Sequence, residues 1–248
     1  MKTAKEQLVL KKTHDFSASK EPSLAVIFVH GIASDSSTFD QALKHLESKK
    51  SLNDVRFIAF DLLGSGKSYK SDDLNYDYHD QLSALHNSIA NLKLDIPLVL
   101  VGHSLGTLIV AKYASEHKND VKKLILISLP VYTKQDFENP AFETAIKLFK
   151  DAIALRNRKI LEDKAFINSM EKIALNRQNY HMLQNLKTPT VIIYGDRDQL
   201  IAPHNLPNLL KINGNIEAVK TKGKHGVTRD KFSELAKSLE EVLNAEII

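Results

Sequence analysis

The sequence predicts an α/β fold in which a predominantly parallel central sheet carries helices on both faces. Apolar runs of strand length recur along the chain, and amphipathic segments of helical period separate most of them. A strand that is followed by a helix and then by a parallel strand places that helix on one face of the sheet. With 248 residues, the chain is long enough to bury a full core as one domain of this kind.

Five apolar runs have the length and composition of buried strands. Strands of a parallel sheet are apolar on both sides because helices cover both faces. Residues 7–12 alternate weakly and predict an edge strand, and residues 215–221 predict a late strand with polar residues on one side. The five buried runs are Leu24–Val29, Val55–Phe60, Pro97–Val101, Leu124–Ser128 and Thr190–Tyr194.

Helices are predicted where apolar residues lie three to four positions apart. The segments 36–50, 74–93 and 104–117 follow this spacing between the early strands, and residues 231–248 have the pattern of an amphipathic closing helix. Helical connections of this kind make successive strands parallel and place helical layers on both sides of the sheet.

The alternation of strands and helices stops between Thr133 and Leu186. Residues 141–153 have the pattern of one amphipathic helix, and two shorter helical patterns run through Met170 and Met182. Apolar helices beyond the carboxyl ends of the strands would cover the crevice in which such sheets bind ligands, so we predict that this segment is a lid. The alternative is a surface excursion without a functional role. The predicted parts are a first core part at 1–132, a helical cap at 133–186 and a second core part at 187–248.

Composition excludes several functional classes. The chain has no cysteine, which removes disulfides, thiol catalysis and cysteine-bound zinc. The net charge of +4 comes from lysines interleaved with acidic residues, which indicates a solvated surface and argues against a nucleic-acid partner. No apolar stretch approaches about 18 residues, and residues 1–20 show no signal peptide. We therefore expect no stable membrane insertion and a cytoplasmic location.

The most specific motif follows the third buried run. Gly102, His103, Ser104, Leu105 and Gly106 form a G-x-S-x-G pattern between a predicted strand and a predicted helix, which is typical of a nucleophile elbow. The glycines remove side chains that would collide at a sharp turn. The amide end of the following helix favours negative charge near the serine hydroxyl. Ser104 is therefore a candidate nucleophile.

A nucleophilic serine needs a base and an acid that orients the base. Asp196 and Asp198 lie in the loop after the strand at 190–194, and His225 lies in a glycine-flanked loop after the last strand. The chain order of serine, acid and histidine is the order found on sheets of this kind. Either aspartate can supply the acid on this evidence, whereas residues 128–130 at the end of the preceding strand carry no carboxylate.

Four motifs together resemble those of the α/β-hydrolase superfamily, in the subgroup with a short helical cap. The resemblance covers nearly the whole chain and implies that fold, with a cap inserted between two strands. The motifs are His30-Gly31 after the first buried strand, Asp61-Leu62-Leu63-Gly64-Ser65-Gly66-Lys67-Ser68 after the second, the elbow at Ser104, and Gly195-Asp196-Arg197-Asp198 followed by the His225 loop.

The resemblance also implies roles for individual residues. It makes Ser104 the nucleophile and His225 the general base and acid. It makes Asp198, the third residue after the glycine of its loop, the group that fixes the tautomer of the imidazole, in preference to the aspartate two positions earlier. It further implies an oxyanion hole formed by the backbone amides of Ile32 and Leu105.

Other residues near these motifs have structural interpretations. His30 resembles a family residue that holds the oxyanion loop, and His103 is a structural neighbour at the variable position of the elbow. His79 and His86 lie seven positions apart on one helix without a carboxylate that completes a ligand set, so no metal site is predicted. Lys224 stands where the family often has a glycine before the catalytic histidine, which is a departure in that loop.

These observations predict a cofactor-free serine hydrolase that acts on a small or medium acyl substrate through an acyl-enzyme on Ser104. Carboxylic esters are the first expectation. An apolar lid with Phe142 and Phe149 favours an acyl or aromatic substrate over a sugar. We expect cap residues to form the pocket together with Ile32, Leu105 and Val131.

Several other activities use the same three groups. Hydrolysis of thioesters, hydrolysis of carbon–carbon bonds and cofactor-free perhydrolysis remain alternatives. A non-catalytic protein that binds a small molecule is an alternative of another class, and the presence of all three catalytic residue types argues against it. Cap helices often mediate dimers, which makes a homodimer a candidate, but the sequence does not determine the oligomeric state. The natural substrate and its acyl chain length are not determined by the sequence.

Overall fold

The computed structural model describes residues 8–156, 163–198, 200–225 and 232–247. Within them, seven strands form one sheet in the order β1-β3-β2-β4-β5-β6-β7. All neighbouring strands are parallel except β1, which pairs antiparallel with β3 at one edge. The strands are β1 (Lys11–Ser17), β2 (Leu24–Val29), β3 (Val55–Asp61), β4 (Leu98–His103), β5 (Lys123–Ile127), β6 (Thr190–Gly195) and β7 (Ile216–Thr221).

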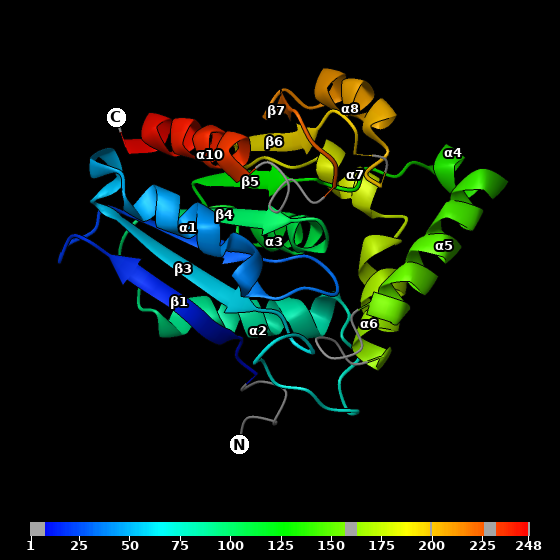
Figure 1. Cartoon of the computed structure of the whole chain (residues 1–248), viewed down its shortest axis with the longest axis horizontal. Coiled ribbons are helices and arrows are strands. Elements are labelled where there is room, and N and C mark those ends of the chain that lie inside the picture. Colours follow the sequence, from blue (N-terminus) through cyan, green and yellow to red (C-terminus); the bar gives the residue numbers. More distant parts are fainter. Residues whose placement is uncertain (1–7, 157–162, 199, 226–231, 248) are drawn as a thin grey trace.

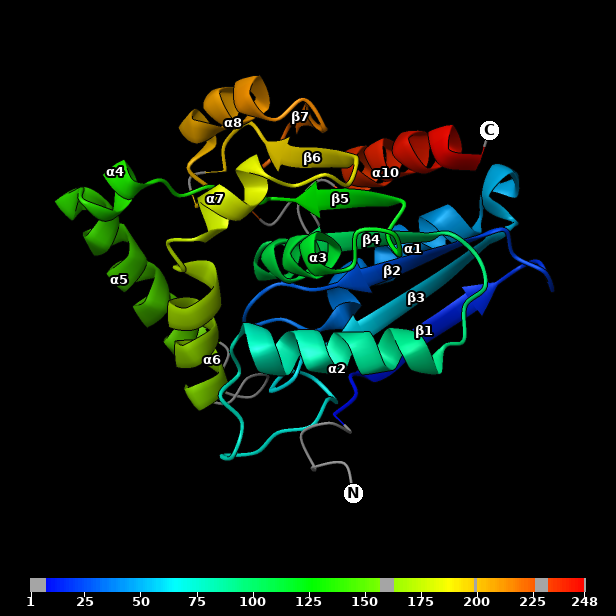
Figure 2. The ribbon, with the colours of Figure 1, turned by 180° about the vertical axis from the view of Figure 1, so that it is seen from behind.

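Two helical layers enclose this sheet. Helices α1 (Asp40–Glu47) and α10 (Phe232–Ile247) cover the face seen in Figure 1. Helices α2 (Tyr78–Asn91), α3 (Leu105–Glu116) and α8 (Leu206–Ile212) pack on the opposite face, and Figure 2 shows α2 and α3 in front of the strands. The predicted fold class, a predominantly parallel sheet with helices on both faces, is confirmed.

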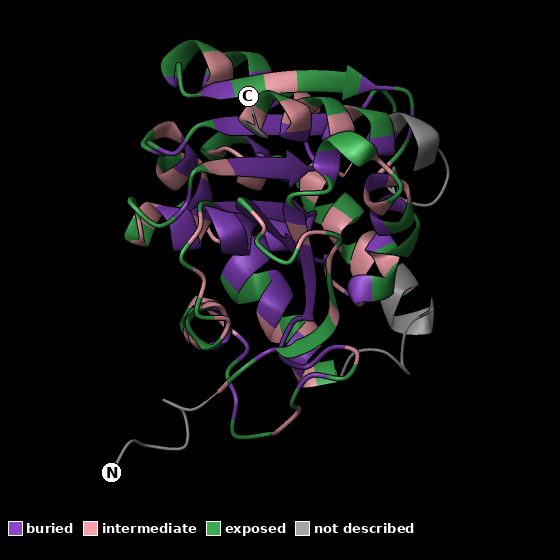
Figure 3. Cartoon of the chain, turned by 90° about the vertical axis from the view of Figure 1, so that its left-hand side faces the viewer, coloured by how far each residue is buried: buried purple, intermediate pink, exposed green. Residues whose placement is uncertain are grey.

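Strand β2 shows why the central strands were recognisable from sequence. All six of its residues are buried. Val26 and Phe28 pack with Leu43 of α1, whereas Ile27 and Val29 pack with Leu108 of α3 on the other face. Figure 3 shows the central strands as buried and the helices as partly exposed. A strand buried on both faces is apolar along its whole length, which is the pattern that predicted it.

The predicted edge strand at 7–12 is wrong in position. The edge strand β1 begins at Lys11, and most of its residues are exposed. Leu10 is instead 4% exposed, and its amide donates a hydrogen bond of 2.7 Å to Ser88 Oγ on α2. Leu10 therefore packs against a helix before β1 begins, while Arg56 of β3 holds β1 through an ion pair with Asp15.

The predicted helices between the early strands are present but shorter than their patterns. Residues 36–39 form a 3-10 helix, η2 (Ser36–Phe39), before α1. Helix α2 begins at Tyr78 because the Asp77 side chain accepts the Asp80 amide at 3.1 Å and caps the helix. Among the described residues, no helix is both long and apolar enough to cross a bilayer.

Residues 133–186, which we call the cap segment, are inserted between β5 and β6. Figures 1 and 2 place its first helices beyond the carboxyl ends of the strands. The later part, η4 and α7, packs against α3. The described part of the segment contains helices and no strand, whereas its exact boundaries stay a prediction. Its helices are α4 (Lys134–Phe137), α5 (Pro140–Arg156), α6 (Asp163–Ser169), the π-helix η4 (Met170–Ala174) and α7 (Asn179–Gln184).

Candidate active site

The turn at Ser104 lies between β4 and α3. Ser104 has φ 50° and ψ −118°, a conformation that side chains rarely adopt. A Cβ atom at Gly102 would lie 2.6 Å from the Thr107 amide nitrogen, and one at Gly106 would overlap the Val29 carbonyl. The two glycines therefore let the turn close against α3 and β2, and the turn directs Ser104 away from the end of the strand.

Three loops bring Ser104, His225 and Asp198 together. His225 Nε2 lies 2.9 Å from Ser104 Oγ. His225 Nδ1 lies 3.0 Å from Asp198 Oδ2 and 3.1 Å from Asp198 Oδ1. The Asp198 side chain is fully buried, and it also accepts the Leu200 amide at 3.1 Å. An ionised Asp198 holds the proton on Nδ1 and leaves Nε2 free to accept the serine proton.

Asp196 has a different neighbour from Asp198. Its carboxylate accepts the Gly223 amide at 2.9 Å, and this hydrogen bond lowers the pKa of the exposed Asp196 side chain. Asp196 therefore ties the loop after β6 to the loop that carries His225. The structure places Asp198, and not Asp196, against the imidazole.

The backbone of His225 is held by two side chains. His103 Nε2 donates to the His225 carbonyl at 3.3 Å, and Ser128 Oγ donates to the same oxygen at 3.4 Å. Burial, together with the nearby His225, lowers the pKa of His103 to about 3, so its ring is neutral. Its Nδ1 is buried without a hydrogen-bond partner among the described residues. The contact of Ser128 with His225 was not predicted, since no local pattern indicates it.

His30 orients the peptide that joins Gly31 to Ile32. Its Nδ1 donates to the Gly31 carbonyl at 2.7 Å, and its Nε2 accepts the Leu62 amide at 2.9 Å. Complete burial lowers the pKa of His30 and keeps the ring neutral. The carbonyl and the amide of one trans peptide point in opposite directions, so this hydrogen bond also sets the direction of the Ile32 amide.

A cavity of about 30 Å³ lies above Ser104. Most of its lining is apolar, and Ile32 and Leu105 both border it. Val131 was expected in this lining but is fully buried behind it, while its neighbours on either side face the cavity. The cavity is lined by Ile32, Ser104, Leu105, Pro130, Tyr132, Ile146, Phe149, Met170, Ala174, Leu200 and His225.

One group of metal-ligand type occurs among the described residues, formed by Asp77, His79 and Asp80 at the start of α2. Asp77 caps the helix, and Asp80 accepts the amides of Asn75 and Tyr76. These carboxylates already satisfy backbone donors, so the cluster is explained as a helix cap.

The comparisons with known proteins agree with this architecture. A family model described as "alpha/beta hydrolase fold" matches residues 25–158. "Probable lysophospholipase BODYGUARD 1" of Arabidopsis thaliana is 33% identical over 108 residues, which are 44% of this chain and 23% of that protein. "Lipase 1" of Psychrobacter immobilis is 24% identical over 221 residues, with 75% of this chain and 65% of that protein covered.

A solved structure shows the same fold over nearly its whole length. The esterase of Exiguobacterium antarcticum superposes with a TM-score of 0.72 at 18% identity, and the match covers 95% of this chain and 98% of that one. The chain spans about a quarter of the length of the first curated relatives that it matches.

Proposed function

Because the chain belongs to the α/β-hydrolase fold family, we propose that it is a hydrolase in which Ser104, His225 and Asp198 form a catalytic triad. The proposed reaction is the hydrolysis of small to medium acyl substrates, and first of all of carboxylic esters. The observation that carries this proposal is the continuous chain of hydrogen bonds from Asp198 through His225 to Ser104 Oγ.

The proposed reaction proceeds in two halves. His225 Nε2 accepts the proton of Ser104 as Oγ attacks the ester carbonyl, and the amides of Ile32 and Leu105 stabilise the oxyanion. The C–O bond to the alcohol then breaks, and His225 returns its proton to the leaving oxygen. In the second half, water attacks the acyl-enzyme, His225 accepts the proton of that water and then returns it to Ser104, and the acid leaves.

The lining of the cavity supports an uncharged substrate. Apart from His225, its side chains contain no titratable group except the Tyr132 hydroxyl, and burial raises the pKa of that group. A charged substrate group would lose its hydration there without a partner charge. Relatives named lysophospholipase and lipase favour oxygen esters, whereas thioesters, carbon–carbon bonds and perhydrolysis would use the same three residues.

The first test is the rate of hydrolysis of p-nitrophenyl esters from acetate to palmitate, with the Ser104→Ala protein beside the parent. We expect turnover by the parent and a loss of at least about 10³-fold in kcat for the variant, since removal of the nucleophile leaves only oxyanion and binding effects. Folded parent protein without Ser104-dependent turnover on any ester would contradict the proposal and favour a thioester or carbon–carbon substrate or a binding role.

The two aspartates provide a matched test of the acid. Asp198→Asn should lower kcat by about 10⁴-fold, because the amide stabilises the wrong tautomer of His225. Asp196→Asn keeps an oxygen that can accept the Gly223 amide, so it should leave kcat within about twofold of the parent. Equal losses in both variants would argue against Asp198 as the acid.

The homodimer and the cytoplasmic location stay predictions.

A further inference from the structure

A second and larger cavity adjoins the one above Ser104. It is a groove of about 600 Å³ between the cap segment and the loops after β6. Tyr132, Ile146 and Leu200 border both spaces and therefore form the wall between them. In size the groove falls within the range of small-molecule sites, about 300–1,000 Å³, whereas the cavity above Ser104 has room for only one or two waters.

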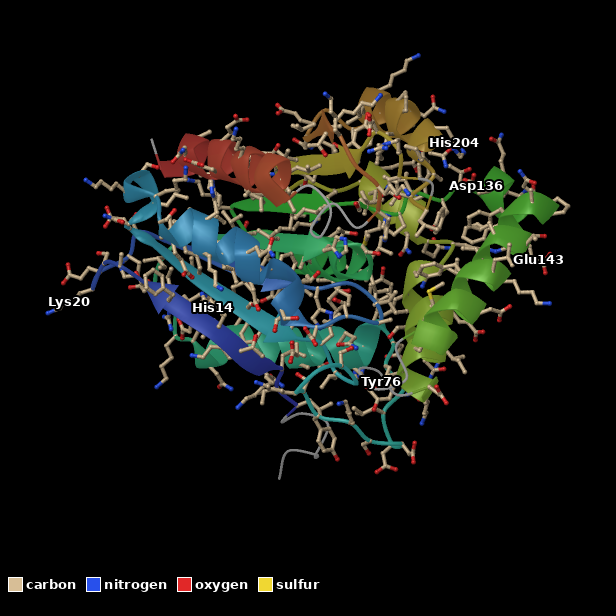
Figure 4. The ribbon with its side chains drawn as sticks, viewed as in Figure 1. His14, Lys20, Tyr76, Asp136, Glu143 and His204 are labelled. Atoms are coloured by element: carbon tan, nitrogen blue, oxygen red, sulfur yellow. The ribbon has the colours of Figure 1, made fainter. Side chains whose placement is uncertain are left out.

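The groove has an apolar interior and a polar rim. Phe142 and Ala145 of α5, together with Pro203, contribute apolar surface to it. The polar side chains of the lining have partners within the protein: His204 Nε2 lies 3.0 Å from Asp136, Arg197 Nε lies 3.6 Å from Asp196, and Asp198 lies 3.0 Å from His225 Nδ1. Figure 4 shows Asp136 and His204 close together where α4 approaches α8.

Such a surface suits an uncharged alkyl chain. The interior offers apolar contacts, and the acidic side chains of the lining already have partners within the protein, so an alkyl chain enters without having to bring a charge. Asp136 is also engaged on its other side, where the Thr133 amide and Asn205 Nδ2 donate to it at 2.7 and 2.8 Å. The side chains on the rim are therefore occupied with one another and with the backbone.

Tyr132 is the part of the wall that is held in place from both sides. Its hydroxyl donates a hydrogen bond to the Leu200 carbonyl. Its ring packs edge-on against Phe142 with 4.8 Å between centroids, and against Phe137 with 6.2 Å. Leu200 in turn donates its amide to Asp198. The ring is thus fixed between the cap segment and the loop that carries the proposed catalytic acid.

We propose that Tyr132 determines the chain length of the substrate by separating Ser104 from the apolar groove, so that the parent enzyme acts on short-chain esters. This inference rests on the proposed hydrolase function. A substrate chain of more than about two carbons does not fit the cavity above Ser104, and it would have to pass the Tyr132 ring to reach the groove. Replacing the ring with a methyl group joins the two spaces.

The test compares kcat/KM for p-nitrophenyl acetate, butanoate, octanoate and decanoate, and for the acetate esters of ethanol, butanol and octanol. The parent should favour the short members of both series. Tyr132→Ala should raise the ratio of octyl to ethyl chains at least about 10-fold in one series, because hydrophobic pockets discriminate by about this factor for such additions. The series that responds shows whether the acyl or the alcohol chain enters the groove.

Two control variants distinguish the effect of removing the Tyr132 ring from the effect of a general loosening of the cap segment. Phe137 touches both Tyr132 and Phe142 but borders neither cavity, so Phe137→Ala should keep the short-chain preference. Tyr132→Phe keeps the ring and should keep the preference as well. A shift in either of these variants equal to that of Tyr132→Ala would overturn the inference. So would the absence of a shift in Tyr132→Ala, or a parent that hydrolyses octanoate as well as acetate.

A binding measurement tests the inference apart from catalysis. Titration calorimetry of the Ser104→Ala protein with ethyl butanoate and ethyl octanoate gives the affinity without turnover. Adding Tyr132→Ala should tighten octanoate binding at least about 10-fold relative to butanoate. If the parent hydrolyses no ester, the proposed function fails, but this titration still tests the role of Tyr132. An unchanged ratio of the two affinities would count against that role.

Discussion

His103 and His30 are neutral rings that are buried in the protein, with 8% and 0% of the residue exposed. Burial lowers the pKa of each of them, for His103 to about 3. In the unfolded chain both would titrate near 6.5. Below that pH the unfolded state binds protons that the folded state does not, so the free energy of unfolding falls as the pH falls from about 6.5 toward the pKa of the folded state.

We expect the free energy of unfolding to fall between pH 7 and pH 5 by up to about 2 kcal/mol for each of these two histidines. The measurement is urea denaturation at both pH values. His103→Gln keeps a side-chain donor near the His225 carbonyl and does not titrate, so it should remove about half of the fall. A variant with the same pH dependence as the parent would show that His103 is not held neutral.

The backbone of Ser104 stores strain in the folded protein. Its φ of 50° and ψ of −118° disfavour any residue with a Cβ atom. Ser104→Gly and Ser104→Ala both lack the hydroxyl, and only the glycine relieves the strain. The glycine variant should exceed the alanine variant in free energy of unfolding by about 1 kcal/mol after its greater unfolded-state entropy is taken into account. Urea denaturation of the two inactive proteins measures the difference, and equal values would mean an unstrained turn.

The candidate residues that the sequence predicted share one property: each follows a strand. Ser104, Asp198 and His225 come after β4, β6 and β7, and the carboxyl ends of parallel strands meet at one edge of the sheet. Ser128 and Tyr132 could not be found in this way. Their roles depend on the carbonyl groups of His225 and Leu200, and these are 97 and 68 positions away in the chain.

At the level of helices and strands, α3 packs so closely on β2 that there is no space for a side-chain atom at Gly106. A Cβ atom at Gly106 would overlap the carbonyls of Val29 and His30, and neither backbone can withdraw from the packed sheet. Gly106→Ala should therefore lower the free energy of unfolding by about 3 kcal/mol or more. At Gly214 an added Cβ meets no atom within 4 Å.

Gly214→Ala is the matched control for this prediction and should change stability by less than about 1 kcal/mol. Thermal unfolding of both variants beside the parent gives the comparison. A small effect at Gly106 would mean that α3 can shift on the sheet without cost.

The helices and strands differ in how well the sequence alone predicts their positions and their contacts. The buried strands β2 and β4 were predicted because burial on both faces leaves a continuous apolar run. Strand β1 was misplaced, since an edge strand whose residues are mostly exposed carries no such pattern. Helix α5 was predicted from its apolar spacing, but the packing of Phe142 on one cavity and Phe149 on another required the structure.

At the scale of the whole molecule, the proposed catalytic groups come from opposite parts of the sequence. His225 lies 121 positions after Ser104, and β5 and β6 lie between β4 and β7, the strand that precedes His225, in the finished sheet. Contacts of such sequence separation form slowly, because the intervening chain must first lose its freedom. Helices and turns can form well before Ser104 acquires its base.

Turnover is therefore a reporter of completed folding. A chain that has regained its helices but has not docked β7 would give a native-like far-ultraviolet spectrum and no hydrolysis. Assays of refolding, of truncated chains or of stabilising additives can use ester cleavage to count only those molecules in which the last strand is in place.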